Sequence, residues 1–106
     1  MAIDLVTEIY KMTEGFPSKE GFGLTAQMRR AAISVPSNIA EGLTRKTNKD
    51  KLHFLNVGQA SLSEIDTQVE IALRLGYIGE ETYQVVEQKL VEVQMLLSGL
   101  SRTIST

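Results

Sequence analysis

The 106-residue sequence contains no cysteine and no tryptophan, and only one histidine. Without cysteine the chain can form no disulfide and has no thiolate for catalysis or metal binding. No apolar run approaches the length of a membrane span, and the N-terminus lacks the basic segment and apolar core of a signal peptide. Apolar residues at 42% and charged residues at 23% are ordinary for a soluble domain. We therefore expect a single domain over residues 1–106, located in the cytoplasm.

The single histidine, His53, leaves little room for catalysis or metal binding. A di-iron bundle needs two Glu-x-x-His motifs and further glutamates, which one histidine cannot supply. A nucleophile activated by a general base would also depend on His53 and on a serine that the fold brings beside it. The sequence predicts a non-enzymatic protein with no catalytic residues, no metal and no cofactor. An enzyme that uses His53 stays open as a minor alternative.

Residues 24–43 predict the helix around which the fold is organised. The apolar residues form one stripe at helical spacing, and the stripe keeps its phase across Pro36. Proline removes a backbone N–H and disturbs a helix, so the chain could stop before Pro36 and restart at Asn38, with Glu41 completing a capping box. The continuous phase favours one helix that is kinked at Pro36. The stripe consists of Leu24, Met28, Ala31, Ala32, Val35, Ile39, Gly42 and Leu43.

Two further rows on this helix suggest packing partners on more than one side. One row is small and apolar, and the other is polar and faces either a subunit interface or solvent. The helix after residue 47 is also thin where glycine, alanine and serine replace larger residues, which permits another backbone to approach closely. We predict an oligomer interface at Ala26, Ile33, Ala40, Gly58 and Ser61. The polar row is Gln27, Arg30, Ser34, Asn38 and Glu41.

Three other helices complete the prediction. The first covers residues 2–13, with Leu5, Ile9 and Met12 on its buried side, and is followed by a loop in which Phe16 and Phe22 are expected to plug one end of the bundle. The next helix is expected to start at Thr47, with Asp50 three residues later, and to stop at Gly76. Its stripe is Leu55, Leu62, Ile65, Val69, Ala72 and Leu73.

The last helix has the most regular pattern, a heptad seam that follows Gly79 as the N-cap. The seam is Tyr83, Val86, Leu90, Val93, Leu97, Leu100 and Ile104. Four helices with short connections predict the fold class: all-α, an antiparallel up-down four-helix bundle.

Charge is distributed unevenly along the chain. The net charge is −2, but residues 29–51 carry six cations and two carboxylates, so this segment is +4 and the remainder is −6. Such asymmetry is compatible with an anion-binding face or with a merely solvated segment. Arg29 and Arg45 are about 24 Å apart along an unbroken helix, which indicates two small patches in one monomer. The candidate phosphate contacts are Arg29, Arg30, Arg45, Lys46, Lys49 and Lys51.

Three stretches of the sequence resemble the bacterial four-helix-bundle family encoded by 23S rRNA intervening sequences. They are FPSKEGFGLTAQMRRAAISVPSNIAEG (Phe16–Gly42), the basic turn after it, and GQASLSEIDTQVEIALRLGYI (Gly58–Ile78). Family members usually have a longer first helix with a tryptophan, so we expect a truncated helix or a misplaced start at Met1. The resemblance implies a ring-like homopentamer. It also implies kinship to the accessory protein of diversity-generating retroelements, which binds nucleic acid and a reverse transcriptase.

Two function classes follow from these observations. The leading hypothesis is a homo-oligomeric bundle that binds RNA or DNA through phosphates, in which several copies build a basic surface from a negative monomer. Base stacking is not expected, because few aromatic residues lie near the cations. The alternative is a protein-interaction scaffold, an oligomeric adaptor whose basic turn is solvated. In either case the partners are further copies of the chain, with a reverse transcriptase-like protein possible by family analogy and no membrane.

Overall fold

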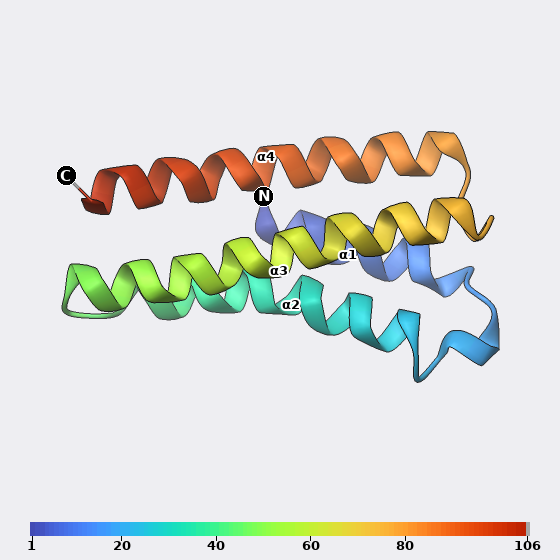
Figure 1. The fold of residues 1–106 in the computed structure, drawn as a ribbon, viewed down its shortest axis with the longest axis horizontal. Coiled ribbons are helices and arrows are strands. Elements are labelled where there is room, and N and C mark those ends of the chain that lie inside the picture. Colours follow the sequence, from blue (N-terminus) through green and yellow to red (C-terminus); the bar gives the residue numbers. More distant parts are fainter. Residues whose placement is uncertain (106) are drawn as a thin grey trace.

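The computed structural model describes residues 1–105, which contain four α-helices and one short 3-10 helix and no strand (Figure 1). Consecutive α-helices run antiparallel, which confirms the predicted all-α up-down bundle. The elements are α1 (Ala2–Glu14), η1 (Ser18–Glu20), α2 (Leu24–Leu43), α3 (Asn48–Arg74) and α4 (Glu80–Ser105).

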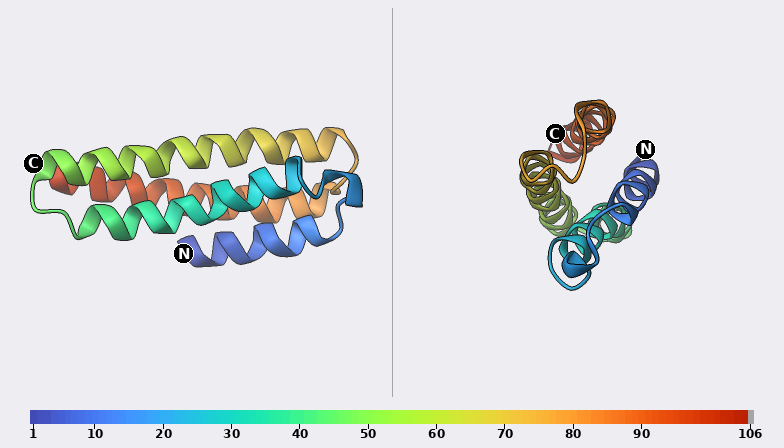
Figure 2. Two further views of the ribbon diagram at one scale, coloured as in Figure 1. Left: turned by 90° about the horizontal axis from the view of Figure 1, so that it is seen from below. Right: turned by 90° about the vertical axis from the view of Figure 1, so that its right-hand side faces the viewer.

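The helices pack in a closed order in which α2 contacts α1 and α3, and α4 contacts α3 and α1 (Figure 2). The helices α3 and α4 have 27 and 26 residues, whereas α1 has only 13. The first residue of α1 therefore lies near the middle of the bundle's long axis (Figure 1). One half of the bundle has four helices, and the half that holds the α2–α3 connection has three.

The core consists of the predicted apolar stripes with few exceptions. The predicted α1 residues are buried, the α3 stripe is buried except for the half-buried Leu73, and the α4 seam is buried or half-buried along its length. Burial of this apolar area is the main force that holds the helices together. On α2 the prediction was wrong for Leu43, which is 50% exposed because the three-helix half has nothing to cover it. The fully buried large side chains include Leu5, Ile9, Met28, Val35, Leu55, Ile65, Val69, Val86, Val93 and Leu97.

The helix α2 continues through Pro36, as the phase of its apolar stripe predicted. Pro36 has no N–H for the carbonyl one turn earlier. Two residues after the proline, the side-chain amide of Asn38 (Nδ2) donates hydrogen bonds to the Ser34 carbonyl at 2.7 Å and to Ser34 Oγ at 2.9 Å. Asn38 therefore stabilises the proline-containing turn from inside the helix and does not restart a second helix.

Both ends of α3 have the predicted local chemistry. Thr47 is the N-cap, and its hydroxyl accepts a hydrogen bond from the Asp50 backbone N–H at 3.1 Å. At the other end Gly76 has a φ of +78°, a conformation that only glycine adopts readily. The N–H groups of Gly76 and Tyr77 bond to the carbonyls of Leu73 and Ala72, a pattern that satisfies the last carbonyls of a helix.

The loop between α1 and α2 closes one end of the bundle with one phenylalanine, not two. Phe16 is buried, and its ring centroid lies 5.2 Å from that of Tyr77. The Tyr77 hydroxyl donates a hydrogen bond to Glu20 Oε2 at 2.8 Å, which fixes η1 against the end of α3. The prediction for Phe22 was wrong: its side chain is fully exposed, between Gly21 and Gly23.

Candidate nucleic-acid interface

Four of the six predicted cations lie together where α2 ends and α3 begins. Thr44 is the C-cap of α2, Thr47 is the N-cap of α3, and only a short connection separates the two helices. The helices approach closely here, because a methyl group added to Gly42 would lie 3.2 Å from both the Lys51 carbonyl oxygen and Phe54 Cβ. We refer to Arg45, Lys46, Lys49 and Lys51 as the basic corner.

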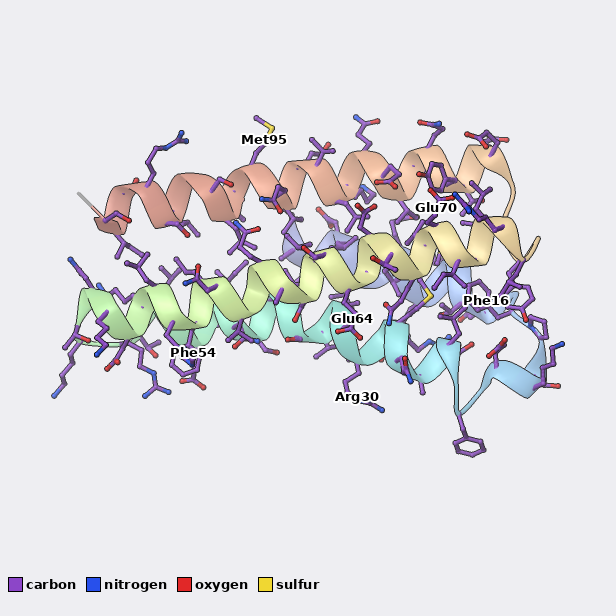
Figure 3. All side chains as sticks on the ribbon, viewed as in Figure 1. Phe16, Arg30, Phe54, Glu64, Glu70 and Met95 are labelled. Carbon is purple, nitrogen blue, oxygen red and sulfur yellow. The ribbon has the colours of Figure 1, made fainter. Side chains whose placement is uncertain are left out.

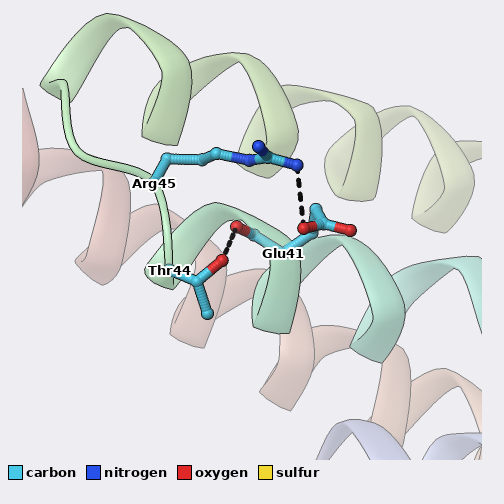
Figure 4. A network of polar contacts seen from close by, with 3 residues as sticks. All are labelled: Glu41, Thr44 and Arg45. Carbon is cyan, nitrogen blue, oxygen red and sulfur yellow. Dashed lines mark hydrogen bonds and ion pairs between the residues drawn. The ribbon is translucent and has the colours of Figure 1, made fainter.

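The Arg45 side chain is held in one position by two contacts. Its Nη2 atom lies 2.8 Å from Glu41 Oε2 in an ion pair one turn back (Figure 4). Its guanidinium carbon also lies 4.7 Å above the centre of the Phe54 ring, within the range of a cation–π interaction. Thr44 supports the same turn by donating a hydrogen bond to the Glu41 carbonyl at 2.8 Å (Figure 4). Arg45 is thus a fixed, partly neutralised cation at the base of the corner.

The three lysines are the unpaired charges of the corner. Lys46 and Lys49 are exposed and Lys51 is half-buried, and none of the three takes part in an ion pair within residues 1–105. Four cations and one carboxylate, Asp50, give residues 45–51 a net charge of +3. Flexible lysine side chains of this kind bind phosphate oxygens as point charges, without a fixed geometry.

The other two predicted cations, Arg29 and Arg30, lie elsewhere on α2 and differ in their surroundings. Arg29 Nε donates a hydrogen bond to Thr13 Oγ1 at 2.8 Å, and its guanidinium carbon lies 4.5 Å above the Tyr10 ring. Arg29 therefore connects α1 to α2. Arg30 is exposed and points away from the bundle (Figure 3). The structure thus divides the six cations into a corner of four, one engaged arginine and one free arginine.

His53 lies on the surface of α3, edge-on to Phe54 with ring centroids 5.2 Å apart. Within the part of the chain that the structure describes, no group of three or more histidine, cysteine, aspartate or glutamate side chains could hold a metal ion. No helix of residues 1–105 is long and apolar enough to cross a membrane.

The residues predicted for an oligomer interface fall into two groups. Ile33 is exposed and Ala26 is half-buried on the outer side of α2, whereas the exposed Ala40 lies beside the start of α1 and lines an apolar hollow with Met1 and Ile3. Gly58 and Ser61 lie inside the fold. Gly58 faces Leu97, since a methyl group added to it would meet Leu97 Cδ1 at 3.7 Å, and the Ser61 hydroxyl hydrogen-bonds that of Ser34 at 2.8 Å. The close approach that the small residues permit is made by α2 and α4 of the same chain.

A second charged feature, which the sequence did not predict, lies on the outer side of α3 and α4. Asp66 and Glu70 of α3 and Glu87 of α4 line a shallow groove of about 480 Å³, with Tyr83 and Arg74 beside them. Glu70 lies where the two helices face each other (Figure 3). Its carboxylate pairs with Arg74 at 3.3 Å and lies 3.5 Å from the Tyr83 hydroxyl. We refer to the surface lined by Asp66, Glu70 and Glu87 as the acidic groove.

Two groups of the groove, Glu87 and Tyr83, have raised pKa values. Burial, followed by hydrogen bonding to Asp66, raises the pKa of Glu87. Hydrogen bonding to Glu87, together with burial and the neighbouring carboxylates, raises the pKa of Tyr83 to about 12. Asp66 and Glu70 lie one turn apart on α3, but Glu87 joins them only because α4 packs against α3, so the sequence alone did not indicate the groove.

Comparison with known proteins places this architecture in a family. The sequence matches the model of the 23S rRNA-intervening sequence proteins over residues 1–99. The chain belongs to this family. Among solved structures, the chain is similar to a protein of unknown function from the S23 ribosomal protein family of Bacteroides thetaiotaomicron. The TM-score is 0.83 and the sequence identity is 22%, and the match covers 94% of each chain. That likeness shows the fold alone. No curated protein matches the sequence.

Proposed function

We propose that this protein is a non-enzymatic, homo-oligomeric nucleic-acid-binding bundle that contacts the phosphates of RNA or DNA through its basic corner. The observation that supports the proposal is the concentration of cations at the α2–α3 connection, where the three lysines have no carboxylate partner within residues 1–105. Arg29 does not contribute, because its guanidinium is engaged with α1. Contacts to phosphates position a nucleic acid without reading its sequence.

Self-association reconciles this role with the negative charge of the monomer. A chain with net charge −2 repels a polyanion at long range, and a single corner with a charge of +3 provides only a few phosphate contacts. Several copies in one assembly would present several corners to the same nucleic acid. Linked sites of this kind bind far more tightly than each site alone, because each contact after the first is intramolecular.

Titration of a fluorescent single-stranded RNA and a DNA duplex at several salt concentrations tests the proposal. Each neutralised phosphate contributes about −0.7 to −0.9 to the slope of log K against log salt concentration. Replacing Lys46, Lys49 and Lys51 with glutamine should therefore reduce the slope by about 2 or more per bound corner. The matched control replaces Lys11, Lys19 and Lys89 with glutamine and removes the same charge outside the corner. Equal slopes for the two triple variants would overturn the proposal.

A protein-interaction scaffold is the second candidate, and the exposed apolar side chains on α2 and α1 favour it. Ile3 is 71% exposed and Ile33 is 44% exposed. In this function the apolar surface would hold a partner protein, such as a reverse transcriptase-like protein, and the basic corner would be solvated. The ratio of absorbance at 260 and 280 nm separates the two: nucleic acid that co-purifies and is released by a high-salt wash supports the nucleic-acid binder, and its absence supports the scaffold.

A further inference from the structure

Two charged surfaces lie outside the basic corner: the acidic groove and the outer side of α2. They carry charges of opposite sign. The acidic groove carries three carboxylates and one cation, Arg74, which already pairs with Glu70. Along the groove, Ile71 and Val91 are exposed apolar side chains, 43% and 55% accessible. A surface of this kind fits a partner that presents a cation beside apolar residues.

The outer side of α2 presents that combination. Arg30 is exposed and points away from the bundle (Figure 3). Its guanidinium takes part in no hydrogen bond or ion pair within residues 1–105. Ile33 lies three residues later, with the half-buried Ala26 on the same outer row. The small side chain of Ala26 lets another helix approach the α2 backbone closely.

These two surfaces cannot meet within one molecule. The acidic groove lies between α3 and α4, whereas Arg30 projects from α2 on the side that faces away from α4 (Figure 3). Each copy therefore carries one surface of each kind, and they point in different directions. Complementary patches at different places on one chain join copies head to tail, which produces a closed ring when the rotation closes and a filament when it does not.

From this complementarity we infer that the acidic groove of one copy receives the outer side of α2 from the next copy, with Arg30 between Asp66, Glu70 and Glu87. The planar guanidinium of arginine can bond two carboxylates at once, and its apolar neighbours cover Ile71 and Val91. This inference rests on the self-association in the proposed function and names its contact surfaces. It leaves the basic corner outside the interface, free for phosphates.

A charge swap tests this contact in the full-length protein. Light scattering at low salt should give a multiple of the 11.7 kDa monomer mass for the wild type. Arg30→Glu alone and Asp66→Lys alone should each reduce the mass toward that of a monomer, because each places like charges in contact. The double variant R30E/D66K restores one pair of opposite charges in each contact, although Glu70 and Glu87 stay in the groove, and should recover a mass clearly above that of either single variant. Both positions are exposed, so the variants should keep the wild-type circular dichroism spectrum.

Matched controls keep the charge change but move it out of the contact. Lys11→Glu on α1 repeats the change of Arg30→Glu, and Glu92→Lys on α4 repeats that of Asp66→Lys. Both controls should assemble as the wild type does. A monomeric wild type at tens of micromolar, or single variants that assemble like the controls, would overturn the inference.

The same samples separate this inference from the proposed function. If the charge swap changes the mass as expected but replacing the lysines of the corner leaves the slope of log K against log salt concentration unchanged, the interface is supported and phosphate binding through the corner is contradicted. If replacing the lysines reduces the slope but the charge swap has no effect on mass, phosphate binding is supported and this interface is contradicted.

Discussion

The Arg29 guanidinium lies 4.5 Å above the Tyr10 ring while its Nε donates a hydrogen bond to Thr13 Oγ1 at 2.8 Å. Thr13 is buried, and its hydroxyl donates in turn to the Ile9 carbonyl at 2.7 Å. This chain of contacts adds a polar connection between α1 and α2 to the apolar packing of Leu5, Ile9 and Met12. Arg29 is thus a structural residue, although its charge and its neighbour Arg30 make it look like a phosphate ligand.

Arg29→Gln should lower the free energy of unfolding by about 1–2 kcal/mol, since it removes the charged hydrogen bonds to Thr13 Oγ1 and the Tyr10 carbonyl and one partly exposed cation–π contact. Urea denaturation followed by circular dichroism measures the change. Arg30→Gln is the control and should have an effect within about 0.5 kcal/mol, because its side chain is solvated. Equal losses for the two variants would contradict a structural role for Arg29.

Gly42 and Gly99 form a matched pair of helical glycines. Alanine at Gly42 would place its Cβ 3.2 Å from the Lys51 carbonyl oxygen and should destabilise the protein by about 1–3 kcal/mol. Alanine at Gly99 meets nothing within 4 Å and should stabilise it by up to about 1 kcal/mol through helix propensity. Thermal unfolding should lower the Tm of Gly42→Ala and raise that of Gly99→Ala. A Tm of Gly42→Ala equal to or above that of the wild type would show that α2 and α3 can move apart at little cost.

Glu87→Gln should raise the Tm at pH 7.5. Burial raises the pKa of Glu87, so the folded state binds this proton more tightly than the unfolded state does. Its contribution to stability is therefore fully present below the ordinary pKa of 4.5 and is lost as the pH rises through the folded pKa. Glutamine is always neutral, so it should restore this contribution at pH 7.5 and raise the Tm there by a few degrees at most. At pH 4 it should leave the Tm unchanged. The comparison belongs in the R30E background, where no second copy fills the acidic groove.

Thr47→Ala should cost about 1 kcal/mol, because the N-cap hydroxyl satisfies the backbone N–H of Asp50. Thr7→Ala is the control, since the Thr7 hydroxyl bonds only the Ile3 carbonyl of its own helix on an exposed surface. Urea denaturation should show a loss for the first variant and none for the second. The N-cap variant should also weaken RNA binding, because it loosens the turn that presents Lys46 and Lys49.

Much of the fold could be predicted from sequence because its determinants are local. The apolar periodicity of α2 predicted that the helix continues through Pro36. The N-cap at Thr47 and the helix end at Gly76 depend on residues within one turn of each other. The apolar seam of α4 could be identified because helical spacing alone places it on one face. None of these predictions required knowledge of which helices would be neighbours.

The functional surfaces were harder to predict because they depend on contacts between helices. Small residues permit close packing with any helix, so the sequence could not show that Gly58 and Ser61 would face the chain's own α4 and α2. The formal charge of Arg29 gave no indication that Thr13 and Tyr10 would engage it. Phe22 was predicted to be buried because it is aromatic, but the loop turns it outward.

The short α1 makes the bundle uneven in its resistance to local opening. The half of α3 that leads to Gly76 lies at the level of α1 along the bundle, in the part with four helices, whereas the amides near residue 50 lie where only three helices meet (Figure 1). Hydrogen–deuterium exchange should therefore be slowest in the first region and faster toward the basic corner. A polyanion that grips both sides of the α2–α3 connection would slow exchange there, and so would act as a clamp on the least protected end of the molecule.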